Sequence, residues 1–241
     1  MSYQPAETWS FAFAQPDGEL FATATVWDGG SCSTFGTPLR AEGAGPAEEW
    51  RLTGDGVALT FAPVGEPAEL ELADAGITTL YQLARVQGTL SLDGGEREVD
   101  CPGQRTRRLG ILDPKRFAAL RAVSGWFGDA DGVAVLAARP RKARGHDSEL
   151  LDAVLLDDGV PVHVSEPRLS STYTAAGVPA RVGLELWLGE EDDADQYARR
   201  AAAEAIGRAA ACPDPQLRAE LLRWRMQGRV GVGVYELLET R

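Results

Sequence analysis

The feature that most constrains this chain is an alternation of side chains with a period of two residues. Residues 8–13, Thr-Trp-Ser-Phe-Ala-Phe, alternate large and small side chains, and residues 19–27 return with alternate positions sharing one face. Between them lies Asp17-Gly18, a pair that tolerates the positive φ a hairpin needs. The pattern therefore predicts antiparallel strands joined by tight turns.

The longest alternating segment, residues 79–92, is closed into a hairpin with residues 96–100 by Asp93-Gly94-Gly95. Strands of this length favour barrels over small sandwiches, and Gly88 can mark a bend. The same alternation predicts further strands at residues 121–127, 133–139, 150–156, 160–165, 169–174, 181–188 and 229–239. We therefore expect a mainly β fold.

Only the C-terminal part has helical signals. Residues 195–211 contain eight alanines, and Asp214 followed by Pro215 is typical of a helix start. Leu217, Leu221 and Trp224 then follow at spacings i, i+4 and i+7, which form one stripe on a helix. The sequence predicts helices at about 195–211 and 215–227.

Charge limits the partners of the chain. The net charge of −12 disfavours nucleic-acid binding, because phosphate contacts need cations. Residues 105–144 are the exception, with ten Lys or Arg against three Asp or Glu. This basic segment is either a solvated strand face and loop, or a rim that attracts an anionic ligand or an acidic carrier protein.

Cysteine use and hydropathy favour a cytoplasmic protein without a membrane span. Cys32, Cys101 and Cys212 form no CxxC pair, no stretch approaches 18 apolar residues, and the first 16 residues lack a signal-peptide pattern. His146 and His163 are too far apart for a recognisable metal motif, so we expect no metal and no cofactor. The sequence leaves the oligomeric state open.

Three segments carry a family resemblance. They are Tyr81-Gln82 with Val86–Gly94, Cys101–Asp113, and Gly228–Glu236. They resemble the hydroxyneurosporene synthase/AttH-like, lipocalin-related superfamily, which has a G-x-V-x-V-D-G hairpin and then a G-x-R-D-H-S-W-G-x-R-D stretch. The resemblance implies two packed lipocalin-like (calycin-type) antiparallel β-barrels with a ligand cavity. We place the N-terminal barrel at residues 1–104 and the C-terminal barrel, with its helices, at 105–241.

The second motif is degenerate in this chain. Gly103, Arg105, Gly110 and Asp113 fit it, but its Asp-His-Ser-Trp positions hold Thr106, Arg107, Arg108 and Leu109. An Asp-His pair can move protons, whereas guanidinium groups stay charged. The chemistry that uses that pair is therefore lost or altered, and Arg107 and Arg108 could instead bind a carboxylate or phosphate.

The candidate catalytic residues are Glu236, Tyr81, Tyr173 and His146. Glu236 shares a strand face with three valines, so it is either a buried carboxyl suited to proton transfer or a strand-end residue paired with an arginine. His146-Asp147 is the only adjacent His–acid pair, and it is either an acid/base at a barrel mouth or part of a solvated loop.

The candidate substrate-binding residues are Arg105, Trp126, Trp187 and Tyr235. Aromatic side chains with polar tips suit a pocket for an apolar ligand, although they also form ordinary core. Arg105 would act as an electrostatic anchor.

Two functions remain open. The first is an enzyme of specialised metabolism that encloses an apolar polyene or polyketide-like substrate and catalyses hydration, isomerisation or cyclisation. The second is a non-catalytic carrier of an apolar ligand, and a weaker third is a scaffold whose basic segment docks an acidic partner.

Overall fold

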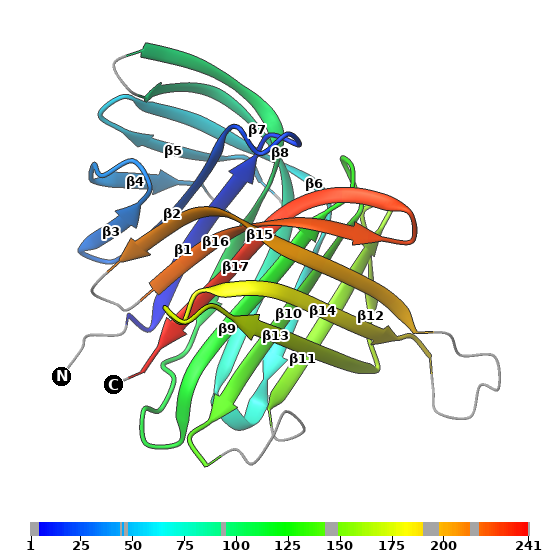
Figure 1. Cartoon of the computed structure of the whole chain (residues 1–241). Helices are drawn as coiled ribbons and strands as arrows, with labels where there is room; N and C mark the ends of the chain where they lie inside the picture. The colour runs from blue at the N-terminus through cyan, green and yellow to red at the C-terminus, as the bar shows by residue number, and fades with distance from the viewer. Residues whose placement is uncertain are drawn as a thin grey trace.

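The computed structural model describes residues 5–43, 45, 48–92, 95–142, 149–189, 198–212 and 217–240. They form two antiparallel sheets, apart from one short 3-10 turn at Ala73–Ala75 (Figure 1). The first sheet has the order β3 (Gly30–Ser33), β2 (Phe21–Trp27), β1 (Glu7–Ala14), β8 (Gly95–Leu109), β7 (Ile77–Leu92), β6 (Val57–Leu72), β5 (Trp50–Gly54) and β4 (Leu39–Glu42). The second has the order β12 (Val160–His163), β11 (Leu150–Asp157), β10 (Gly132–Pro140), β9 (Phe117–Trp126), β17 (Arg229–Glu239), β16 (Leu217–Met226), β15 (Arg199–Cys212), β14 (Pro179–Trp187) and β13 (Glu166–Tyr173).

Each sheet curls around an apolar core of its own. Phe11, Phe13 and Phe61 lie inside the first barrel, and Val135 and Trp224 lie inside the second. Because successive side chains of a strand point to opposite faces, the other face of each sheet is free to pack against the other barrel. A third apolar cluster fills that layer, with members from β1, β2, β6 and β7 of one barrel and β9, β10, β11, β16 and β17 of the other. The predicted fold class, two packed lipocalin-like barrels, is confirmed.

The predicted C-terminal helices are wrong. Residues 199–212 form β15 and residues 217–226 form β16, while residues 195–197 and 215–216 of the predicted helices lie outside the described part. In β16, Leu222 and Trp224 face the second barrel's core and Ala219 and Leu221 face the layer between the barrels. A strand that is apolar on both faces also contains the spacings i, i+4 and i+7, so the apparent helical stripe comes from two buried strand faces.

The alanines of β15 have a different explanation. Ala201 and Ala203 point into the barrel, where small side chains fit, and they alternate with exposed Arg200, Ala202 and Glu204. β15 pairs with β14 over residues 199–204 and with β16 over most of its length, so tertiary context overrides the helix propensity of alanine.

The two barrels also meet through their main chains. The Glu66 N–H of β6 donates to the Gly159 carbonyl in the β11–β12 turn at 2.7 Å. Gly65 and Gly159 both have positive φ, +68° and +76°, and a Cβ on either would contact the other's backbone at less than 3 Å. Glycine is therefore needed at both positions. The described part of the chain holds no helix that is long and apolar enough to cross a membrane.

Candidate functional site

Several buried or half-buried polar side chains lie in the apolar layer between the barrels, and we call seven of them the polar seam. The first barrel supplies four and the second three: Thr79, Tyr81, Gln104 and Arg108, and Ser124, Trp126 and Glu236. Their positions follow from strand alternation, since Tyr81 lies on the face of β7 that carries Ile77 and Leu83, and Glu236 lies on the face of β17 that carries Val234 and Leu238. The strand face on which the sequence pattern placed Glu236 with three valines is thus the face toward the other barrel.

The outer end of the seam contains Glu236 and Arg108. Glu236 is 9 % exposed, Arg108 is half-buried, and Arg108 pairs with Thr79 across β7 and β8. Burial raises the pKa of the Glu236 carboxyl to about 7, and the charge of Arg108 opposes part of that rise. Within the described residues, no ion pair shorter than 4.0 Å joins the two groups. Arg108 therefore acts on Glu236 through space and leaves its carboxyl free to gain or lose a proton near neutral pH.

The middle of the seam contains Tyr81 and Ser124. Tyr81 is 2 % exposed, its hydroxyl lies beside the side chains of Ser124 and Trp126, and burial raises its pKa. The hydroxyls of Thr79, Tyr81 and Ser124 are all buried and none has a hydrogen-bond partner within the described residues. Orphaned buried hydroxyls are rare in native proteins and commonly mark the place of a water or a ligand group.

The inner end of the seam is closed by a hydrogen bond. Trp126 Nε1 donates to Gln104 Oε1 at 3.0 Å, and both side chains are buried. Arg108 and Gln104 are four residues apart on β8, which corresponds to about 13 Å of extended strand. The seam is therefore a buried track of polar groups that runs inward from the Arg108–Glu236 end.

Tyr173 and Tyr235 lie elsewhere: Tyr235 is buried inside the second barrel, and Tyr173 is 41 % exposed at the end of β13. Their hydroxyls are hydrogen-bonded at 2.8 Å, and burial raises the pKa of Tyr235. Arg121 lies close enough to oppose that rise, and it forms a buried ion pair with Glu149 in which each side chain is 5 % exposed. Tyr235 and Glu236 are neighbours in sequence but face opposite sides of β17, so they belong to different polar clusters.

Arg105 lies inside the first barrel, on the face of β8 opposite to the seam. Its guanidinium lies 5.8 Å from the Trp9 ring centroid and 5.1 Å from that of Trp50, and it donates to the Glu48 carbonyl at 3.1 Å. Burial lowers its pKa to about 10. Arg105 is therefore separated by the sheet from Tyr81 and Glu236.

Of the other sequence candidates, those that the structure describes do not join the seam. Trp187 lies on β14, and its buried Nε1 has no hydrogen-bond partner in the described part of the chain. Arg107 is ion-paired with Glu7 at 2.9 Å and lies over Trp9. His146 lies outside the described residues. The described residues contain no group of three or more His, Cys, Asp or Glu that could hold a metal ion.

Sequence reasoning missed several polar residues that the structure brings together. Thr79 and Ser124 had a signal, because each is a polar residue at a position whose strand neighbours two residues away are apolar or amphipathic. Arg108 was considered as a departure from a motif and as a group that could bind a carboxylate or phosphate, but not as a neighbour of Glu236. Arg121 and Glu149 had no local signal, because their pairing joins β9 to the start of β11, 28 residues away.

Sequence comparison finds no matching family model and no matching curated protein. The fold, in contrast, matches solved structures. The crystal structure of CghA with Sch210972 has a TM-score of 0.64 at 13% sequence identity, over 97% of this chain and 88% of that one. A protein assigned as AttH (NE1406), from Nitrosomonas europaea, has the same TM-score and identity over 98% of this chain and 92% of that one. The chain therefore has an AttH-like, lipocalin-related double-barrel fold.

Proposed function

We propose that the chain is an enzyme that binds a small, largely apolar molecule along the polar seam and moves a proton on it. The observation that carries the proposal is that Glu236 and Tyr81 face the same layer between the barrels, where the buried hydroxyls of Thr79, Tyr81 and Ser124 have no hydrogen-bond partner among the described residues. The reaction class is hydration, isomerisation or cyclisation. The CghA structure with Sch210972 supports the proposal, because a chain of the same fold was crystallised with a named ligand.

The chemistry follows from the groups present. A carboxyl with a pKa of about 7 is present in both protonation states near neutral pH, so Glu236 can act as a general acid or a general base. The hydroxyls of Thr79, Tyr81 and Ser124 can donate to an oxygen that becomes negative during reaction. The surrounding apolar side chains exclude water and hold the substrate near its reactive shape.

A carrier is the second candidate, and one observation favours it. The motif positions that hold Asp and His in the similar family hold Thr106 and Arg107 here, and Arg107 is engaged by Glu7 and Trp9. No histidine therefore supplies a proton at that point, and Glu236 would have to do so alone.

The test begins with the pure protein incubated in extracts of the producing cell, followed by native mass spectrometry for bound molecules. Recovery of a consumed substrate and its product supports an enzyme, and recovery of an unchanged ligand supports a carrier. Turnover should fall at least 100-fold in Glu236→Gln. Glu220→Gln is the matched control, because Glu220 is also a buried glutamate with a pKa raised by burial but lies inside the second barrel, opposite Tyr235. Equal turnover in wild type and Glu236→Gln would remove Glu236 from the mechanism.

A further inference from the structure

Two adjoining hollows lie against β13, β14, β15 and β16 of the second barrel. Their volumes are about 1190 Å³ and 740 Å³. They share four lining residues, Ser170, Gly183, Ala202 and Arg225. The strand register places these four opposite one another, in one row that crosses all four strands. The hollows are therefore two parts of one depression, which we call the outer groove.

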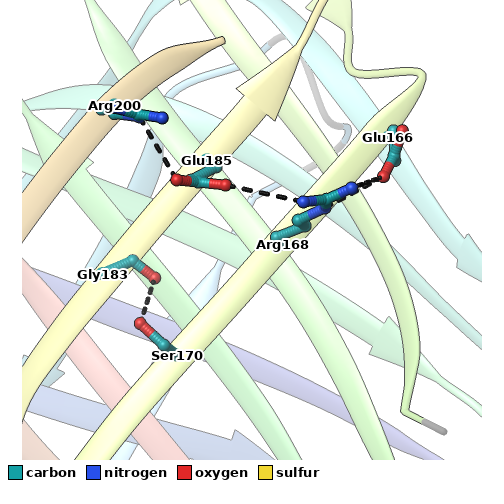
Figure 2. A network of polar contacts seen from close by, with 6 residues as sticks. All are labelled: Glu166, Arg168, Ser170, Gly183, Glu185 and Arg200. Carbon is teal, nitrogen blue, oxygen red and sulfur yellow. Dashed lines mark hydrogen bonds and ion pairs between the residues drawn. The ribbon is translucent and has the colours of Figure 1, made fainter. Parts of the chain in front are cut away.

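The floor of the outer groove is low because its side chains are small. Gly183 and Ala202 occupy the centre of the row, and Ser170 Oγ is turned onto the sheet, where it donates to the Gly183 carbonyl at 3.3 Å (Figure 2). The depression is thus formed by side chains that are short relative to those on both sides.

Charged rows flank this floor. On one side Glu185 contacts Arg200 at 3.2 Å and Arg168 at 3.8 Å, and Arg168 contacts Glu166 at 2.6 Å, so the four charges form a chain across the strands (Figure 2). On the other side Arg181 contacts Glu204 at 3.5 Å, in a row that ends at Arg223. These contacts join the flanking side chains to one another along the two rows beside the floor.

The groove carries an excess of positive charge. Its lining contains five arginines, at 168, 181, 200, 223 and 225, against Glu166, Glu185 and Glu204. Glu149 also lines it, but Glu149 is neutralised by its buried ion pair with Arg121. Arg225 is exposed and forms no ion pair or hydrogen bond with any residue that the structure describes. The groove is therefore a locally positive surface with a free guanidinium on a chain whose net charge is −12, and such a surface attracts anions.

We propose that the outer groove is a second binding site, separate from the seam, for an elongated organic molecule with one oxyanion head. Arg225 holds the head by paired N–H···O hydrogen bonds, a geometry that guanidinium groups offer to carboxylate and phosphate. The tail lies along Ala202, Gly183 and Ser170, between arginine side chains whose methylene groups cover it. The row spans three strand spacings, or about 14 Å, which sets the length of the ligand.

The test is titration calorimetry at low salt with three probes of equal chain length: decanoate, decyl phosphate and decanol. We expect both anions to bind at least tenfold more tightly than decanol, and the stronger of the two identifies the head group. Binding that is equal for decanol and the anions would overturn the proposal.

Two variants locate the site. Arg225→Gln should weaken anion binding at least tenfold, and Ala202→Leu, a change at an exposed position, should block the floor without changing charge. Arg51→Gln is the control, because it makes the same charge change at an exposed arginine of the first barrel. If Arg51→Gln weakens anion binding as much as Arg225→Gln does, the anions respond to the charge of the whole protein and not to the outer groove, and the proposal is overturned. Glu236→Gln should bind decanoate as wild type does. The two proposals are therefore tested separately: turnover of Glu236→Gln tests the seam, and anion binding by Arg225→Gln tests the outer groove.

Discussion

Trp126 of the second barrel donates its indole N–H to the side-chain oxygen of Gln104 in the first barrel, at 3.0 Å. Both side chains are buried, and their strands come from different sheets. The bond is thus a polar contact that both barrels must supply, inside a layer that is otherwise mainly apolar. It fixes how the two barrels are placed relative to one another at the inner end of the seam.

Replacement of Trp126 by Phe should destabilise the protein by about 2–3 kcal/mol. The change removes the donor, leaves the Gln104 oxygen buried without a partner, and opens some space beside Tyr81. The double variant Trp126→Phe/Gln104→Leu should recover part of the loss, because neither polar atom is then orphaned. Urea unfolding of wild type, both single variants and the double variant measures the coupling, and strictly additive effects would show that the bond contributes nothing specific.

Replacement of Tyr81 by Phe should raise the free energy of unfolding by about 1 kcal/mol. The Tyr81 hydroxyl is buried and forms no well-aligned hydrogen bond with any described residue, so the nearby Ser124 and Trp126 side chains compensate its desolvation only in small part. If the proposed function holds, the same variant should lose turnover. A variant that is more stable and less active separates a catalytic role from a structural one, whereas a clear loss of stability would mean that the hydroxyl is bonded in solution.

Stability should fall as pH rises through the range in which Glu236 titrates. Its pKa lies near an ordinary 4.5 in the unfolded chain and is about 7 in the folded protein. Below pH 4.5 both states hold the proton; between the two values only the folded state keeps it, and above 7 the folded state bears a buried charge. The contribution of Glu236 to the free energy of unfolding is therefore full at low pH and lost by about pH 8, with a magnitude of up to about 3 kcal/mol.

The measurement is unfolding free energy against pH for wild type and Glu236→Gln. The difference between them should change by that amount between pH 4 and 8, with the variant relatively more stable at the upper end. Glu98→Gln, at an exposed position, is the control for a general charge effect. Parallel curves for wild type and Glu236→Gln would show that folding does not raise the pKa of the Glu236 carboxyl.

Side-chain alternation was enough to predict the β class, the β1–β2 and β7–β8 hairpins and the last strand, because each depends on neighbours in sequence. The same local evidence failed at β15 and β16, where alanines and a doubly apolar strand imitate a helix. It identified Glu236 as a candidate through its strand face, and Tyr81 as an aromatic side chain with a polar tip on a predicted strand. It could not place Arg108 near Glu236, because β8 and β17 are brought together only when the two barrels pack.

The contact between Gly65 and Gly159 gives a test of how the barrels dock. Gly159→Ala should destabilise the protein by about 2–4 kcal/mol, since an added Cβ would lie 2.8 Å from Gly65 Cα and the backbone has a φ of +76°. Gly177→Ala is the matched control, with a φ of +74° and no atom within 4 Å of the added Cβ, and it should cost only about 1 kcal/mol. Denaturant unfolding of both variants isolates the inter-barrel contact as the difference between them. Equal losses would mean that the β11–β12 turn moves away from β6 at no cost, and that this main-chain contact does not hold the barrels together.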